Sequence, residues 1–357
     1  MNRQSMYKTS RIIVSGTIKT SIFIFIVLIV SDYSCIAEAA WYDNVLPHFQ
    51  YVYEAKPVKV ASDISQTFSE THAKHALLVW NYFKSVFHNS PGEFVEIYYT
   101  KDQVYFEKNI LPYAPTLIIP GARVVTYYRD VNHRKWFIIP YITPDFGTQL
   151  HEIGHDFLDI DCPNYWDYYQ SPWFREGLGM YYESGSFDQN GNFAVITPFQ
   201  SFYSIFMNRY NSGTLIPLRE LTSYNDVAFY TTGDVLQHYA QAMMLVYYVM
   251  KVHPSLLLQT FNKIENKEIV NNTQLLNDIL TRLSMTIDQL DAAYIRYSTG
   301  QCWLGDMNCD GQFNIFDLQR LINCISGKGS CAQGDLNGDG QYNIFDVQHL
   351  VNKIFQR

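Results

Sequence analysis

The chain has 357 residues, of which 47% are hydrophobic and 17% charged, and its formal net charge is −8. The apolar fraction excludes a wholly disordered chain, and the acidic balance argues against nucleic acid as the main partner. The length suggests about two domains. Charge is distributed unevenly, because no acidic residue precedes Asp32, whereas carboxylates recur at a fixed spacing near the other end.

An apolar run occupies residues 21–30 and follows a basic leader. This run is too short for an ordinary membrane-spanning helix and is typical of a secretory signal. We expect cleavage after Ala39, at the small-x-small pattern Ala37-Glu38-Ala39, so residues 1–39 form a signal peptide. The mature protein is then secreted, with no stable membrane insertion. An uncleaved N-terminal anchor is the alternative, and cleavage as a lipoprotein at Cys35 fits the preceding residues less well.

The middle of the chain, residues 40–299, is predicted to form one α+β domain, because strand patterns precede helix patterns. A helix is expected over residues 63–86 and strands over Phe94–Thr100, Arg123–Arg129 and Lys135–Tyr141. Helices dominate after Thr143, with expected ranges Gly233–Val252, Ser255–Ile264, Thr273–Leu283 and Ile287–Ser298. Ser298-Thr299-Gly300 separates this main domain from a tail, residues 302–357.

A metal-binding pattern lies at residues 151–155, His-Glu-Ile-Gly-His. Thr143-Pro144-Asp145 just before it is a favourable helix start. On such a helix His151 and His155 project from one face and can share a zinc ion. Zinc lowers the pKa of a bound water to about 7, and Glu152 is then placed to take its proton as general base.

A third ligand is expected from residues 173–183, Trp-Phe-Arg-Glu-Gly-Leu-Gly-Met-Tyr-Tyr-Glu, on a second helix. Gly177 and Gly179 would let this helix pack closely on the first. Together the two segments resemble the gluzincin, or peptidase MA-like, zinc metallopeptidases, whose W-x-x-E-G-x-(A/G)-x-Y-x-E motif supplies the third ligand. The resemblance implies a thermolysin-like zincin fold, with Glu152 as general base and zinc ligands His151, His155 and Glu176.

The resemblance extends beyond these helices. Residues 121–139 are similar to the strand-turn-strand of that group, whose edge strand binds the substrate backbone. Residues 211–221 resemble its linker, and Tyr239-Ala240-Gln241-Ala242 resembles the start of its next helix. A donor to the oxyanion is also expected. Tyr239 is the first candidate, His238 the second and Tyr230 the third, although each could simply pack in the core.

Other assignments of the metal site stay open at this level. His151 and His155 could be surface histidines of an amphipathic helix. The third ligand could instead be Asp156, Asp159 or Asp161, as in aspzincin-like sites, but one helix would then present three ligands nearly in line, which suits tetrahedral zinc poorly. Glu183 either orients a ligand histidine or is a solvated acid.

The tail contains an internal repeat. Residues 305–325 and 334–354 agree at fourteen of twenty-one positions with an offset of 29. Side-chain oxygens fall at the ligand positions of EF-hand-type calcium loops, with glycine at the sixth position. The expected ligands of the two calcium ions are Asp306, Asn308, Asp310, Gln312, Asn314 and Asp317 in the first loop, and Asp335, Asn337, Asp339, Gln341, Asn343 and Asp346 in the second.

These two loop-helix units resemble a type I dockerin, which implies a cohesin-bearing scaffold as partner and an all-α calcium-binding domain. The Ile-Phe pair at loop positions 10 and 11 departs from cellulosomal dockerins, so a free-standing calcium module stays open. We expect disulfides Cys302–Cys331 and Cys309–Cys324, although four cysteines allow three connectivities. Cys162 is expected to be buried.

The sequence thus predicts a secreted, zinc-dependent metallopeptidase that acts on proteins or peptides and carries a calcium-binding dockerin. The alternative is a non-catalytic extracellular protein that docks to a cohesin-type scaffold.

Overall fold

A computed structural model describes residues 46–87, 95–110, 125–128, 135–140, 146–161, 171–269, 271–309, 312–329, 331 and 333–355. The predicted signal peptide, the helix start at Thr143-Pro144-Asp145, Cys162 and the calcium ligand Asp310 lie outside these ranges. Among the described residues, no helix is both long and apolar enough to cross a membrane.

The N-terminal half is built on a five-stranded mixed sheet in the order β1-β2-β3-β5-β4. Its strands are β1 (Tyr51–Ala55), β2 (Val58–Ser62), β3 (Val95–Thr100), β4 (Val125–Tyr128) and β5 (Lys135–Pro140). The two outer pairs, β1 with β2 and β4 with β5, are antiparallel, and the inner pairs are parallel. Three of these strands were predicted, and β4 lies at an edge of the sheet.

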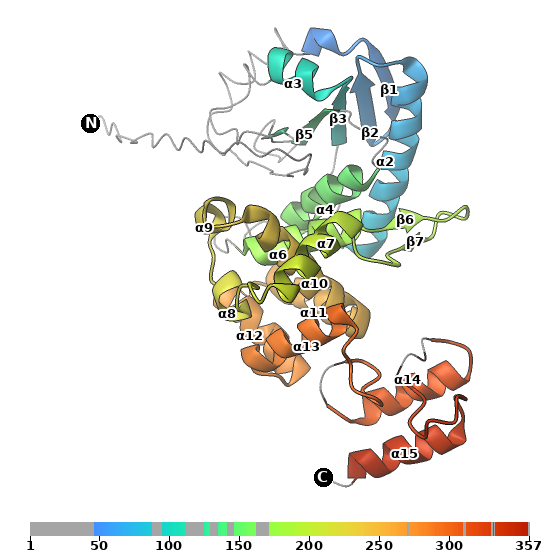
Figure 1. Cartoon of the computed structure of the whole chain (residues 1–357). Coiled ribbons are helices and arrows are strands. Elements are labelled where there is room, and N and C mark those ends of the chain that lie inside the picture. Colours follow the sequence, from blue (N-terminus) through green and yellow to red (C-terminus); the bar gives the residue numbers. More distant parts are fainter. Residues whose placement is uncertain are drawn as a thin grey trace.

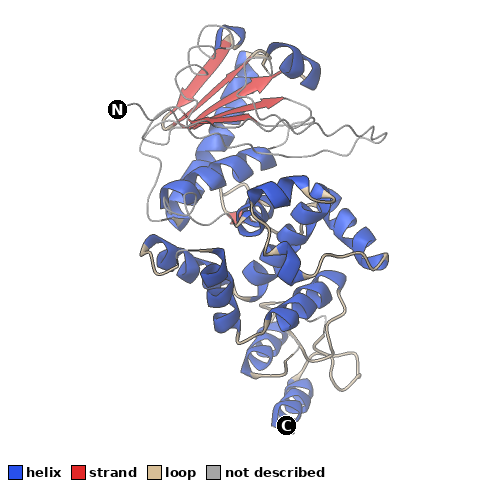
Figure 2. Cartoon of the chain, turned by 90° about the vertical axis from the view of Figure 1, so that its left-hand side faces the viewer, coloured by secondary structure: helices blue, strands red, loops and turns tan. Residues whose placement is uncertain are grey.

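Helix α2 (Gln66–Val86) packs against the sheet. It begins three residues later than predicted because Ser65 is extended and caps it, its side chain accepting a hydrogen bond from Phe68 N at 3.1 Å. The helix buries Ala76, Val79 and Phe83. Helix α3 (Gln103–Asn109) follows β3. Figures 1 and 2 show the sheet at one end of the molecule and the helices extending away from it.

The helical half is organised around α10 (Val235–Val252), which is buried along almost its whole length. It packs on α6 (Pro172–Glu183), which in turn packs on α4 (Gly147–Asp161). The remaining elements are the β6 (Ser186–Phe187) and β7 (Phe193–Ala194) ribbon, α7 (Gln200–Asn211), α8 (Leu218–Leu221), α9 (Asp226–Thr231), α11 (Pro254–Glu265), α12 (Asn272–Leu283) and α13 (Ile287–Thr299). The four predicted late helices are confirmed within two residues at each end.

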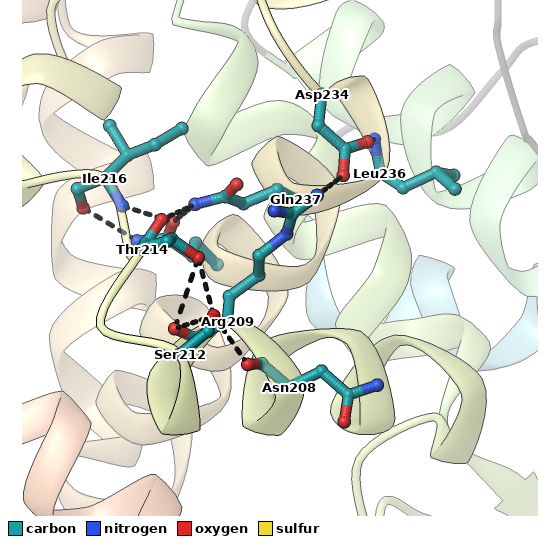
Figure 3. A network of polar contacts seen from close by, with 9 residues as sticks. Asn208, Arg209, Ser212, Thr214, Ile216, Asp234, Leu236 and Gln237 are labelled. Carbon is teal, nitrogen blue, oxygen red and sulfur yellow. Dashed lines mark hydrogen bonds and ion pairs between the residues drawn. The ribbon is translucent and has the colours of Figure 1, made fainter.

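A polar network fixes the segment between α7 and α8 to the start of α10 (Figure 3). Gln237 Nε2 donates to the carbonyl oxygen of Thr214 at 2.7 Å. Gln241 pairs with both backbone groups of Ile216, at 2.9 and 2.8 Å. Arg209 forms an ion pair with Asp234, the N-cap of α10. The glutamine side chains of α10 therefore provide the hydrogen bonds that this linker backbone would otherwise make in regular secondary structure.

The tail contains α14 (Ile315–Ile325) and α15 (Ile344–Phe355), which pack on each other through Leu321 and Leu350. The expected disulfide pairing is wrong: the bonds are Cys302–Cys309 and Cys324–Cys331. Repeat symmetry made Cys302 and Cys331 equivalent positions. A local chain reversal after α14 instead brings Cys331 back to Cys324, so each bond closes within one segment.

Candidate functional site

The two histidines of the metal-binding pattern lie on α4 and are buried, at 0% and 4% exposure for His151 and His155. Their rings lie 4.6 Å apart and nearly perpendicular. Glu176 of α6 faces both, with its Oε2 atom 3.4 Å from Nε2 of His151 and 3.7 Å from Nε2 of His155. The ligand atoms of these three residues all lie within 4.8 Å of one another. We call this set the His–His–Glu group.

Two glycines set how closely α6 approaches its neighbours. A Cβ atom at Gly179 would lie 2.6 Å from Nε2 of His151, so only glycine leaves room for that ring. Gly177 was expected to serve the same contact, but it faces α10, where a Cβ atom would meet the carbonyl oxygen of Ala242 at 2.7 Å. The two positions lie on different faces of α6 because residues two apart on a helix do not share a face.

Glu183, at the end of α6, contacts the far side of the first histidine. Its Oε2 atom lies 3.1 Å from Nδ1 of His151, and both side chains are fully buried. A carboxylate on one ring nitrogen holds the proton there and leaves the other nitrogen available as a ligand. Of the two roles considered for Glu183, the structure therefore favours orientation of the histidine over solvation.

The second oxygen of Glu176 is held by protein donors. Oε1 accepts hydrogen bonds from Arg175 Nε at 2.8 Å and from the hydroxyl of Tyr230 at 2.7 Å. Oε2 makes no hydrogen bond among the described residues and is buried. The carboxylate thus directs one oxygen to α9 and the other to the histidines.

The electrostatics of the group favour positive charge. Burial alone raises the pKa of Glu176, but Arg175 and His155 hold it well below its ordinary value. Burial lowers the pKa of His151, but the nearby carboxylates of Glu176 and Glu183 outweigh it and raise the pKa to about 10. For His155, burial dominates and lowers the pKa to about 3. The carboxylates therefore stabilise a cation beside the two imidazoles.

The residues present fit a divalent metal ion. Two imidazoles and one carboxylate form a donor set that catalytic zinc sites use. Nε2 of His155 is buried and, like Oε2 of Glu176, makes no hydrogen bond within the described part of the chain. Such a polar atom is costly to bury unless a partner satisfies it. Among the described residues, buried carboxylates also outnumber the one buried guanidinium, so a cation would offset an excess of negative charge.

Of the three competing aspartates, Asp156 has a described side chain and does not join this set. The group of described side chains that could hold a metal comprises the two histidines and Glu176. Asp156 is buried but outside that group, and the side chains of Asp159 and Asp161 lie outside the part that the structure describes. The alternative of surface histidines is wrong, since both rings are buried.

The predicted base and oxyanion donors occupy different surroundings. Glu152 is 1% exposed and follows His151 directly on α4. Tyr239 is fully buried, and its hydroxyl makes no hydrogen bond among the described residues. Burial, followed by the negative charge of Glu176, raises the pKa of Tyr239. His238 is instead anchored to α9, with its Nδ1 atom 2.6 Å from the carbonyl oxygen of Phe229.

Tyr230 has a role that sequence reasoning missed, since its hydroxyl is bonded to Glu176. Arg175 was missed altogether, although it is 2% exposed and touches the same carboxylate. The one signal in the sequence is that a basic residue directly precedes an expected ligand. This signal is weak because charged residues are common at helix surfaces. Only the packing of α9 on α6 identifies Arg175 as part of the site.

The calcium loops of the tail place their acids as a loop ligand set requires. In the first loop Asp306, Asn308 and Asp317 are almost fully buried. In the second, Asp335 accepts three backbone N–H groups and Asp346 accepts three more. Gly340, at the sixth position, has a φ of +79°, a conformation that residues with a Cβ rarely adopt. Each helix begins at position 10 of its loop, and the acid at position 12 lies in the first helical turn, so loop and helix form one unit.

Comparison with known families assigns this region. Residues 304–355 match the family model described as a dockerin type I domain, so the tail is a type I dockerin. Domains of this type bind calcium and dock to cohesin-bearing scaffold proteins, and the match supports both properties here. Among the curated proteins, no relative matches the chain.

Proposed function

We propose that the protein is a secreted zinc-dependent metallopeptidase that its dockerin tethers to a scaffold. The observation that carries this proposal is the buried His–His–Glu group, together with Glu183 on the far nitrogen of His151. This combination is the arrangement that a catalytic zinc site needs: three protein ligands, and a carboxylate that orients a ligand imidazole. The resemblance of residues 151–155 and 173–183 to gluzincins, and hence a thermolysin-like zincin fold, supports the same conclusion.

His151, His155 and Glu176 would hold the metal. Bound zinc would supply Lewis acidity for a peptide carbonyl and for the attacking water. Glu152 is the base that takes the proton from this water and returns it to the leaving amine. Tyr239 is the donor that we assign to the oxyanion, because its hydroxyl is buried beside Glu176 and makes no hydrogen bond among the described residues.

The sheet offers a site for the substrate backbone. Among the described strands, β4 pairs with β5 alone and lies at the end of the strand order. An edge strand presents unpaired N–H and C=O groups, to which an extended peptide can add as a further strand. A protein or peptide substrate in extended form is therefore the substrate class that we propose.

Zinc content and hydrolysis test this function directly. The mature full chain is expected to bind one zinc ion and to cleave members of an unbiased peptide library, detected by mass spectrometry. Glu152→Gln should keep the zinc and lose cleavage, whereas Glu70→Gln, at an exposed residue of α2 paired with Lys74, should alter neither. Wild-type protein without zinc, or full hydrolysis by Glu152→Gln, would contradict the proposal.

The dockerin would determine where the enzyme acts. Its match supports a calcium-dependent attachment to a cohesin-bearing scaffold, and with the predicted signal peptide it supports a location outside the cell. Ile315, Phe316, Ile344 and Phe345, at positions 10 and 11 of the two loops, are all more than 60% exposed. Calcium-dependent retention of the chain on immobilised cohesin tests this part of the proposal.

A non-catalytic scaffold-bound protein is the second candidate function. The family match supports docking and calcium binding and covers residues 304–355, not the His–His–Glu group. A zinc-loaded, folded protein that cleaves no member of the library would favour this function over a peptidase.

A further inference from the structure

Three residues form a connected polar group next to Oε1 of Glu176, which is the oxygen that does not face the histidines. Arg175 lies directly before Glu176 on α6, and Asp226 and Tyr230 lie one turn apart on the short helix α9. Arg175 Nε donates to Glu176 Oε1 at 2.8 Å, and Arg175 Nη2 donates to the hydroxyl of Tyr230. That hydroxyl donates in turn to Glu176 Oε1 at 2.7 Å. We call these three residues the Glu176 clamp.

An ion pair also connects the residues of the clamp. Arg175 Nη1 lies 3.4 Å from Asp226 Oδ1, so the guanidinium bridges an acid on each helix. Arg175 is 2% exposed, and a planar guanidinium with several fixed donors can serve partners on different elements at once. The position of α9 relative to α6 therefore affects the position of Glu176, because the planar guanidinium of Arg175 contacts both helices.

The hydrogen bonds to Oε1 restrict the orientation of the Glu176 carboxylate. Oε1 is already occupied by two donors, while Oε2 faces both histidines at 3.4 and 3.7 Å. Rotation of the carboxylate toward a two-oxygen mode would break both bonds to Oε1 in a buried environment, where an unpaired donor is costly. The same bonds prevent the side chain from leaving the histidines.

We propose that the Glu176 clamp is a positioning device that fixes Glu176 as a one-oxygen ligand and raises the metal affinity of the His–His–Glu group. This inference rests on the proposed metal site. Arg175 and Tyr230 act through Glu176 and do not bind the metal themselves. We therefore assign Tyr230 the role of positioning Glu176, and not that of an oxyanion donor.

Zinc affinity of the full chain, measured by competition with a chromophoric chelator, tests the clamp. Tyr230→Phe removes the donor and keeps the ring, and should weaken zinc binding about 10-fold, a typical effect of losing an outer partner of a ligand. Tyr224→Phe is the matched control, because Tyr224 donates to Glu220 at 2.6 Å in the same region of the chain and this hydrogen bond does not involve Glu176. It should leave the zinc affinity unchanged.

Two further measurements separate positioning from stability. Arg175→Lys keeps the positive charge but removes the planar set of guanidinium donors, and it should also weaken zinc binding. When Co²⁺ replaces zinc, both clamp variants should show a visible absorption spectrum that differs from that of the wild type. Thermal unfolding of the metal-free proteins identifies any variant that fails to fold. A folded Tyr230→Phe protein with wild-type zinc affinity and Co²⁺ spectrum overturns the clamp alone. A wild-type chain that binds no zinc overturns the proposed metal site and the clamp with it.

Discussion

The carboxylate of Glu183 lies 3.1 Å from Nδ1 of His151, on the nitrogen opposite the one that faces Glu176. Both glutamates lie on α6, seven residues apart, so one helix supplies the expected third ligand and also orients the first. Two helical turns separate residues seven apart and return them to the same face. The close contact of α6 with α4 is thus the structural basis of the site.

Gly179 should be essential for that contact. In Gly179→Ala the new methyl would lie 2.6 Å from Nε2 of His151 and displace the ring, so zinc affinity should fall at least 10-fold. Gly177→Ala, which meets Ala242 and Val246 of α10, should instead lower the free energy of unfolding by about 1–3 kcal/mol through overpacking and leave zinc binding by the folded protein intact. Chelator competition and urea unfolding measure the two effects. Equal zinc affinity in both variants would argue against this assignment.

Tyr239 and His238 are adjacent candidates with different expected behaviour. Tyr239→Phe should lower kcat by about 10²–10³-fold, the usual cost of losing an oxyanion donor, with little change in zinc affinity. His238→Asn should affect mainly stability, because His238 is bonded to the backbone of α9. Steady-state kinetics on a library-derived peptide separate the two. A normal kcat in Tyr239→Phe would remove it from the mechanism.

Calcium should control folding of the tail. Chelation should melt α14 and α15 together, because each loop leads directly into its helix and a loop deprived of its cation leaves acids in repulsion. Asp346→Ala, which removes the ligand at position 12 and its three backbone contacts, should reproduce this loss for the second unit. Far-ultraviolet circular dichroism and calorimetric calcium titration are the measurements. A helical signal that ignores chelator would refute the calcium dependence.

Arg320 joins the tail to the main domain. Its Nη2 atom donates to the carbonyl oxygens of Lys251 and Val252 at 3.2 and 3.0 Å, at the C-terminal end of α10, where a cation is favourable. Arg320→Ala should therefore lower the free energy of unfolding by about 1 kcal/mol. His349→Ala, at the equivalent and exposed position of the second repeat, is the control and should have no effect. Identical denaturation curves for all three proteins would exclude a stabilising role.

His75 should make stability dependent on pH. Burial lowers its pKa to about 4, from an ordinary value of 6.5, even though it bonds to Gln149 at 2.6 Å. The unfolded chain therefore binds the proton more readily, so stability is complete above about pH 6.5 and declines as the pH falls toward 4. In His75→Asn this decline should be smaller by about 1–2 kcal/mol. Urea unfolding at pH 7 and pH 5 checks it, with His349→Asn as control; an unchanged slope in His75→Asn would contradict the assignment.

Secondary structure in the helical half was predictable because its signals are local. Ranges such as Ile287–Thr299 follow from a capping box at Thr286 and a left-handed Gly300 at the end. The hairpin of β1 and β2 was not predicted, since its strands become recognisable only when paired in the sheet. The disulfides were mispredicted for a related reason: repeat symmetry describes sequence equivalence, whereas bond formation requires proximity in space.

The sequence alone determined which residues of this protein are candidate metal ligands. Histidines four apart on a helix must share a face, and a 29-residue repeat of acids, amides and glycine must produce two similar loops. Only the tertiary structure decided the surroundings of those ligands: that Glu183 contacts His151, that Arg175 and Tyr230 hold Glu176, and that His238 is bonded to α9. These relationships join residues from separate helices, and helix packing depends on the whole buried surface rather than on any local pattern.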